Sequence, residues 1–445
     1  MKRVPFKVGA AELEITPPLN TNLAGYFYQR KAKGVLEPIF VNCIVVAGEK
    51  ETWALVSCDL IGVTLDITNK VRELVAMQTD LEPQQILICC THTHTGPVIS
   101  FSSAPFVRED AYCDFVVQRI VDCVVIAESR LEEAEAFCGR GIVEGVAFNR
   151  RYWMQTGGVT TNPGVGNPEI IRPAGPVDPE VGVIYFFSQA KSQLLGIIVN
   201  FALHADIVEG EKISPDFPGY MRSTLKSILG PNLPVLFTRG CGGDINHIDV
   251  KPKLGSPKRA ALAEKIGKLL AFEVLKIIED PRQERCEAAV WSQVEKTKLH
   301  LRETKSTEVE AAEKLVASVK PTDNDCPEIV RARRILKIAE LGFESIETEV
   351  QVLGLGNVAL AGLPSEIFVE LGLVLKSQSP IPCTWAIDLA NDEFDYVSTE
   401  KAYGEGGYEV NSSPLAPGAG EKLIETALKI INFKYERSQK VTPRI

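Results

Sequence analysis

Ile86-Leu-Ile-Cys-Cys-Thr-His-Thr-His-Thr-Gly-Pro97 predicts a buried strand that runs directly into a loop with two histidines. The apolar run is too short for a helix and rich in β-branched and small residues, and the Gly-Pro ending is typical of a loop. Alternate side chains of an extended segment point to the same side, so His92 and His94 should face one way. Because the chain has only five histidines, this spacing does not follow from composition.

The histidine pair allows two interpretations. Neutral histidine is a common zinc ligand, so two imidazoles at the end of a strand indicate a candidate metal site. The alternative is a pair of hydrogen-bonded histidines in a surface loop, and a short motif alone does not decide between them. Further ligands elsewhere in the chain are needed for the metal interpretation to hold.

The composition is that of a soluble globular protein, with 45% hydrophobic and 24% charged residues over 445 positions. A chain of this length can hold one large α/β domain or two ordinary ones. The net charge of −10 and the lack of a Lys/Arg cluster argue against a nucleic-acid partner. No segment approaches the ~20 apolar residues of a membrane-spanning helix.

The N-terminus and the cysteines predict a cytoplasmic protein. Residues 1–9 lack the apolar core of a signal peptide. The eleven cysteines are scattered without a Cys-x-x-Cys motif, and many lie inside apolar runs, as reduced and buried thiols do. Cys241 differs from these because it lies in a glycine-rich turn at the end of a predicted strand.

Hydrophobic periodicity predicts three strand–helix–strand units with polar side chains at the strand ends. Strands joined by a right-handed crossover are parallel and end at the same sheet edge, where ligands bind in open α/β sheets. We therefore expect an α/β fold with a mixed, largely parallel sheet or sheets flanked by helices, and a site at the carboxyl ends of the strands. The units cover residues 52–90, 194–237 and 358–389. Their polar ends are Asp59 and His92, then His204, Asp206, Asp244 and His247, then Glu366 and Tyr396.

The remaining segments frame these units. A long stretch rich in Gly, Pro and Asn, residues 149–179, is predicted to be a loop that covers the site. Residues 304–342 are predicted to form a peripheral helical hairpin on a single domain spanning 1–445. Further predictions are a helix over 112–136, a strand over 137–146, a helix from 364 to 376, a flexible loop over 404–411 and a closing helix over 420–433.

Several short blocks, spread over nearly the whole chain, resemble one known family. They are the opening 9–18 with its Ile-Thr-Pro-Pro, Thr-His-Thr-His-Thr-Gly-Pro, Asn149-Arg150, Asn200-Phe-Ala-Leu-His204, 216–220, Gly243-Asp244, Pro364-Ser-Glu366 and Tyr396-Val-Ser-Thr399. Together and in this order they resemble the catalytic domain of the neutral/alkaline non-lysosomal ceramidases. The His-Thr-His block and the order of the blocks are the specific part of the resemblance.

The resemblance implies a zinc amidohydrolase that cleaves an N-acyl amide in a small N-acylated substrate. By position, the family's zinc ligands fall on His92, His204, Glu366 and Tyr396. His94 and Arg150 match the residues that support the ligands and bind the oxyanion. The family's immunoglobulin-like C-terminal domain has no counterpart in this sequence.

One block departs from the family. Its Gly-Asp-x-Ser-Pro, with a catalytic serine, is here Gly243-Asp-Ile-Asn-His247, so Asn246 replaces the serine. We therefore expect hydrolysis of a linear amide by a zinc-activated water, on a substrate that need not be ceramide. His94 is the first candidate base and Asp244 the second, while Arg150 would hold the oxyanion.

The replaced block also leaves alternatives open. Asn246 could donate a hydrogen bond to the substrate, and His247 could be an added base or ligand. A thiol mechanism through Cys241 would need a nearby base, for which His247 or His204 could serve. Outside enzymes, a binding protein with a decayed site is the alternative.

Overall fold

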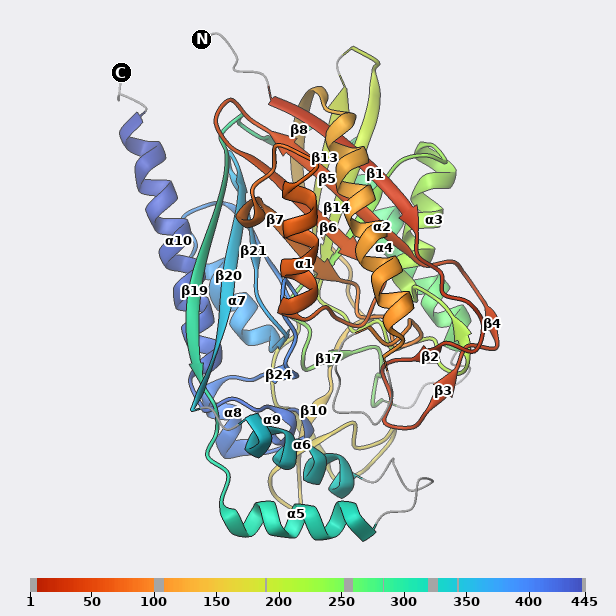
Figure 1. The fold of residues 1–445 in the computed structure, drawn as a ribbon, viewed down its shortest axis with the longest axis vertical. Helices are drawn as coiled ribbons and strands as arrows, with labels where there is room; N and C mark the ends of the chain where they lie inside the picture. The colour runs from red at the N-terminus through yellow and green to blue at the C-terminus, as the bar shows by residue number, and fades with distance from the viewer. Residues whose placement is uncertain are drawn as a thin grey trace.

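The computed structural model describes residues 6–99, 108–188, 190–251, 259–282, 284–318, 327–341 and 344–441. Two stacked β-sheets form its centre, and helices cover the outer face of each (Figure 1). The large sheet has the order β16-β14-β13-β8-β1-β5-β6-β7, and the small sheet the order β19-β20-β21-β23. The mixed α/β sheet flanked by helices is therefore confirmed.

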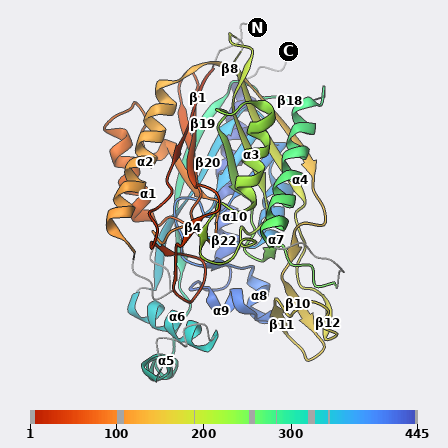
Figure 2. The same ribbon diagram turned by 90° about the vertical axis from the view of Figure 1, so that its right-hand side faces the viewer.

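The strands of the large sheet are β1 (Phe6–Glu14), β5 (Phe40–Ala47), β6 (Thr52–Cys58), β7 (Ile86–Cys90), β8 (Glu132–Ile142), β13 (Glu180–Ser188), β14 (Gln193–Phe201) and β16 (Val235–Arg239). Those of the small sheet are β19 (Val290–His300), β20 (Ser345–Leu355), β21 (Val358–Gly362) and β23 (Cys383–Ile387). Helices α1 (Leu65–Ala76), α2 (Asp110–Ser129), α3 (Phe217–Leu229) and α4 (Arg259–Glu279) cover the large sheet (Figure 2). Helices α7 (Val369–Gln378) and α10 (Ala419–Val441) cover the small sheet.

Burial on both faces explains why the central strands read as nearly continuous apolar runs. In β13, Val183 and Tyr185 pack toward the helices, whereas Ile184 and Phe186 point toward the small sheet. There they join Trp385 of β23 in the core between the sheets. Sheets covered on both sides lose the alternation of apolar and polar residues that marks a half-exposed sheet.

The three predicted crossover units are confirmed, and their strands are parallel. β6 pairs with β7, β14 with β16 and β21 with β23, each pair joined through a helix. The expectation of a largely parallel sheet is wrong, because most other pairs are antiparallel. Many of these strands follow one another through short turns, which produce antiparallel hairpins. The parallel pairs still deliver their carboxyl ends to one edge.

Three local predictions are corrected. The helix predicted over 112–136 ends at Ser129, because Glu132–Ile142 alternates at strand period and pairs with β13. The helix predicted from 364 begins at Val369, because β22 (Glu366–Ile367) pairs with β24 (Tyr396–Val397). The flexible loop over 404–411 contains the end of α8 (Glu400–Glu405) and most of α9 (Tyr408–Ser412).

Two further predictions concern segments outside the two stacked sheets. The long loop over 149–179 is not without structure, since β10 (Arg151–Met154), β11 (Val159–Thr161) and β12 (Ile170–Pro173) form a small sheet. The helical hairpin consists of α5 (Ser306–Ser318) and α6 (Pro327–Leu341), at the lower edge of Figure 1. Within the described ranges, no helix has the length and apolar character that crossing a membrane requires.

Candidate metal centre

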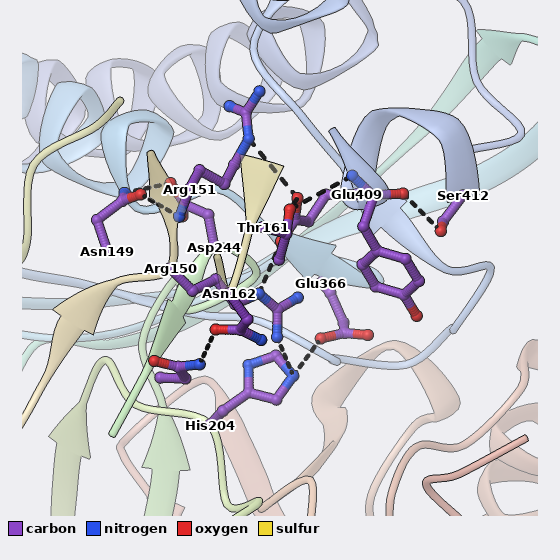
Figure 3. Close-up of polar contacts among 12 residues, drawn as sticks. Asn149, Arg150, Arg151, Thr161, Asn162, His204, Asp244, Glu366, Glu409 and Ser412 are labelled. Carbon is purple, nitrogen blue, oxygen red and sulfur yellow. Dashed lines mark hydrogen bonds and ion pairs between the residues drawn. The ribbon is translucent and has the colours of Figure 1, made fainter. Parts of the chain in front are cut away.

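Three buried side chains from different strand ends converge at the carboxyl edge of the sheets. His92 follows β7, His204 follows β14, and Glu366 begins β22 after β21. His92 Nε2 lies 3.2 Å from His204 Nε2, and Glu366 Oε2 lies 3.2 and 3.0 Å from these two nitrogens. Figure 3 shows His204 and Glu366 pointing toward each other. The prediction that these residues meet is confirmed by the distances.

Backbone carbonyls fix which ring nitrogens face the centre with a lone pair. His92 Nδ1 lies 2.7 Å from Ile61 O, and His204 Nδ1 lies 3.0 Å from Gly242 O. A carbonyl only accepts, so each Nδ1 is the donor and each neutral ring has its lone pair on Nε2. Burial and the Arg150 charge hold the pKa of His204 well below its usual value.

The third donor is a carboxylate. Burial would raise the pKa of Glu366, yet the charge and hydrogen bonds of the two imidazoles in their protonated form outweigh it and hold that pKa well below its usual range. When the two rings are neutral, as metal ligands are, two nitrogen lone pairs and a carboxylate oxygen face one another. Such a set repels itself unless a cation lies between. Tetrahedral zinc bonds of about 2.0–2.1 Å place ligand atoms roughly 3.3 Å apart, which fits the distances.

Tyr396 comes to the same place through the ladder between β22 and β24, in which it is the register partner of Glu366. Its ring lies 5.3 Å from the Arg150 guanidinium and 5.5 Å from the Tyr408 ring. Burial raises the pKa of its phenol well above the usual value. The side chain predicted as a fourth ligand is thus buried beside Glu366 and Arg150.

His94 completes a cluster of three imidazoles. His92, His94 and His204 can each offer one ring nitrogen within 4.8 Å of the others. Neither nitrogen of His94 makes a hydrogen bond to a described residue, although Nδ1 lies 3.5 Å from Asp206. Burial lowers the pKa of His94 to about 4, so the ring is neutral near pH 7.

The backbone around the centre is strained. His92, Ser365 and Asp395 have φ values of 66°, 65° and 73°, in the region that favours glycine. The extended geometry expected for the histidine segment is therefore wrong at His92. The His92 and His94 rings nevertheless pack together, with centroids 4.9 Å apart. Left-handed non-glycine residues cost about 1–3 kcal/mol each and gather at functional sites.

Arg150 points into the centre and is held from behind. Its Nη1 lies 3.5 Å from His204 Nε2, and its Nε donates to Glu409 Oε1 at 2.7 Å (Figure 3). Nη2 has no hydrogen-bond partner among the described residues. Burial alone would lower the pKa of Arg150, but neighbouring groups, Tyr396 first, raise it well above its usual value. The guanidinium therefore presents a fixed positive charge and a free donor.

In the block at residues 243–247, which departs from the family, the side chains of Asp244 and Asn246 hydrogen-bond to neighbouring segments and do not point toward the candidate metal centre. Asp244 accepts from Asn149 Nδ2 and from the Val369 N–H, both at 2.8 Å. Asn246 Nδ2 donates to Asn162 at 2.7 Å, and its Oδ1 accepts from the Ile248 N–H. With both carboxylate oxygens engaged, Asp244 is a poor base in this position. Burial raises its pKa to about 6.

His247 and Asp59 were predicted to lie at strand ends near the histidines. The Asp206 carboxylate acts on the pKa of His247, which burial lowers to about 4, and His247 Nδ1 makes no hydrogen bond to a described residue. Asp59 does not face the histidines, because its carboxylate accepts from Arg222 at 2.6 Å and from the Phe40 N–H. Its segment reaches His92 only through the carbonyls of residues 60 and 61.

Cys241 lies in the hydrophobic core under the small sheet, against Gly372 of α7. It is 3% exposed, and burial raises the pKa of its thiol well above the usual value. A nucleophilic cysteine requires the opposite, an accessible group with a lowered pKa. The geometry therefore removes the thiol alternative.

Two buried charged residues of the centre were not predicted. Arg239, at the end of β16, donates to both oxygens of Asp388 at 2.8 and 2.7 Å and lies 3.4 Å from Glu366 Oε2. Glu409 holds Arg150 and also accepts from Thr161 Oγ1 at 2.7 Å. Arg239 occupies a strand end, a signal that could have marked it. Glu409 lies in the segment expected to be flexible, which gave no such signal.

Comparison with known proteins identifies a family over residues 6–227. The sequence model of the family described as neutral/alkaline non-lysosomal ceramidase, N-terminal, matches residues 6–227. This range contains His92, His94, Arg150 and His204, whereas Glu366 and Tyr396 lie beyond it. A search of curated protein sequences finds no match.

Solved structures share the fold. The crystal structure of neutral ceramidase from Pseudomonas aeruginosa superposes with a TM-score of 0.75 at 18% identity, covering 97% of this chain and 75% of that one. A ceramidase complexed with C2 gives the same TM-score and identity, over 98% of this chain and 76% of that one. The architecture is thus shared at low sequence identity.

Proposed function

Because the chain belongs, over residues 6–227, to the neutral/alkaline non-lysosomal ceramidase family, we propose that it is a zinc-dependent hydrolase of linear N-acyl amides. The carrying observation is the convergence of His92 Nε2, His204 Nε2 and Glu366 Oε2 within 3.2 Å of one another. Lone pairs locked in this arrangement favour a bound divalent cation. The substrate of the protein is a small N-acylated molecule, and ceramide is one member of that class.

His92, His204, Glu366 and Tyr396 would hold the zinc. When bound, zinc supplies Lewis-acid polarisation of a carbonyl and lowers the pKa of water. The carbonyls of Ile61 and Gly242 keep the two imidazoles in the tautomer that a ligand needs. Arg239 anchors Glu366 from the far side through its contacts with Asp388 and Glu366.

The other residues bind and move protons around the scissile amide. Arg150 presents Nη2 for the oxyanion that develops on the substrate carbonyl, a contribution of about 3–4 kcal/mol in comparable sites. His94 accepts a proton from water at a ring nitrogen that has no protein partner. Asp244 positions Arg150 by accepting from Asn149 and by receiving the Arg150 N–H at its carbonyl. Hydrolysis by this route needs no serine at position 246.

The direct test combines metal content with turnover. The purified protein should contain about one zinc at this centre, and His92→Ala and His204→Ala should lose that zinc and the activity together. Substrates should include N-acyl lipids, N-acyl amino acids and acetylated amino sugars, assayed with and without added zinc. Zinc at this centre that survives both substitutions would contradict the assignment.

A second candidate follows from Asn246. If the serine is essential in this fold, the chain is a binding protein that has kept its metal site. The intact set of imidazoles, carboxylate and Arg150 argues for hydrolysis, because a binding site has no need of an arginine with a free donor at that point. Stoichiometric zinc with no turnover of any substrate class, and saturable binding of an N-acyl compound, would favour the binding protein.

A further inference from the structure

A second group of metal-ligating side chains lies away from the candidate metal centre. It consists of Cys138 on β8, Glu284 on β18 (Glu284–Arg285) and Cys383 at the start of β23. Each offers one donor atom within 4.8 Å of the others, and the two Sγ atoms are 3.5 Å apart. Among the described residues, only this group and the three histidines bring together three such donors.

This group lies at the amino end of β23, whereas the candidate metal centre lies at the carboxyl ends of the strands. Cys383 begins β23, whereas Asp388, which anchors Arg239, follows its last residue. β18 is hydrogen-bonded beside β8, with Glu284 as the register partner of Cys138. In Figure 2 these two strands lie near the top, well separated from β22.

The neighbours of the group are those of a ligand set. Asn357 Nδ2 donates to Glu284 Oε2 at 2.9 Å and to Cys138 Sγ at 3.7 Å, so one amide orients two donors. The Cys286 thiol is hydrogen-bonded to Cys138. A surface pocket of about 210 Å³, lined by the three donors, gives access from solvent. Cys43 and Cys123, two buried thiols that lie beside each other elsewhere in the fold, belong to no such three-donor group.

We propose that Cys138, Cys383 and Glu284 bind a thiophilic divalent cation of the zinc class. Thiolate bonds of about 2.3 Å in a tetrahedral site separate two sulfurs by roughly 3.8 Å, close to the observed separation. Water supplies the fourth position. Each thiol gives up its proton when it binds, so metal uptake releases protons and strengthens as the pH rises. Since Cys138 and Cys383 belong to different sheets, the metal clamps the two sheets together.

Cobalt substitution tests this site without interference from the first. The chain, reduced with a phosphine and freed of metal, is titrated with Co²⁺ in the absence of air. Thiolate-to-cobalt charge transfer absorbs in the near ultraviolet, and the histidine centre contains no thiolate. We expect this band in the parent chain and its loss in Cys138→Ser/Cys383→Ser. Glu284→Gln, at an exposed position, should keep the band and weaken affinity by at least about tenfold.

Cys123→Ser is the matched control, because Cys123 is a buried thiol beside another thiol but belongs to no group of three metal-ligating donors among the described residues. It should leave the cobalt band unchanged. Circular dichroism confirms that each variant is folded, and Glu284→Gln provides a test that leaves the core intact. The proposal is overturned if the parent chain shows no thiolate band, if the band survives in Cys138→Ser/Cys383→Ser, or if Cys123→Ser abolishes it.

Discussion

Arg150 reaches the candidate metal centre because a fully buried carboxylate holds it there. Glu409 has a side chain with 0% exposure and accepts from Arg150 Nε and Thr161 Oγ1 with its two oxygens. Breaking a buried ion pair leaves an uncompensated charge, at a cost of about 3–5 kcal/mol. Glu409 is thus a positioning residue, two contacts away from any substrate.

Glu409→Gln should lower kcat by about tenfold to a hundredfold with little change in KM, because the guanidinium loses its fixed direction. The matched control is Glu405→Gln, which removes the other carboxylate beside Arg151, 3.3 Å from it, and leaves the contact between Arg150 and Glu409 in place. Steady-state kinetics on an N-acyl substrate, with zinc content measured in parallel, separate the two. Equal losses in both variants would mean that Glu409 acts only on stability.

Glu37 carries a pH-dependent effect on stability that is separate from the site. Burial raises its pKa to about 7, against the Arg222 charge, and its Oε2 lacks a hydrogen-bond partner among described residues. Between its unfolded pKa of about 4.3 and pH 7, the folded state binds more protons than the unfolded one. The free energy of unfolding therefore falls as pH rises through this window.

Glu37→Gln, which stays neutral, should be more stable relative to the parent chain at about pH 8 than at about pH 5. The side chain is partly exposed, so solvent screening keeps the effect small. Thermal unfolding at both pH values measures it. Glu14→Gln, on the exposed end of β1, is the control and should shift Tm equally at both. A difference for Glu37→Gln that does not grow with pH would contradict the argument.

At the scale of elements, the sequence predicted what is encoded locally. The crossover units were predictable because apolar runs of strand length alternate with helical spacing, and their ends carry His92 and His204. The ladder between β22 and β24 was not, since it joins two-residue segments about thirty positions apart. No periodicity marks so short a pair. Yet this ladder brings Glu366 and Tyr396 together.

Gly243 sets how closely the turn after β16 approaches that ladder. A Cβ at Gly243 would lie 2.6 Å from the Glu366 carbonyl oxygen, whereas at Gly242 the nearest atom would be 3.4 Å away. Gly243→Ala should therefore displace Glu366 and weaken zinc affinity by about 10–100-fold, the loss typical when ligand support is removed. Gly242→Ala should cost much less. Competition with a zinc chelator measures both affinities, and similar values for the two variants would refute the prediction.

At the scale of the whole molecule, segments far apart in sequence meet next to the centre. Helix α6, predicted to be part of a peripheral hairpin, inserts Arg334 between them. Its guanidinium donates to Asp395 at 3.0 Å and to Ser412, and lies 5.5 Å from the Phe27 and Tyr408 rings. Periodicity predicts a helix but not its partner, so this long-range contact could not be predicted. The stacking of the two sheets is another long-range contact that periodicity could not predict.

Arg334 therefore links the hairpin to Asp395, the residue immediately before Tyr396. Arg334→Ala leaves Asp395 without its cation and frees the strained turn, so the phenol of Tyr396 should lose its fixed position. We expect kcat to fall by about tenfold or more while the hairpin stays helical. Arg331→Ala, on the exposed face of the same helix, should leave turnover and zinc content unchanged. If both variants are as active as the parent chain, the hairpin has no part in the function, as its predicted peripheral position suggests. Tyr396 is then positioned by the ladder between β22 and β24 alone.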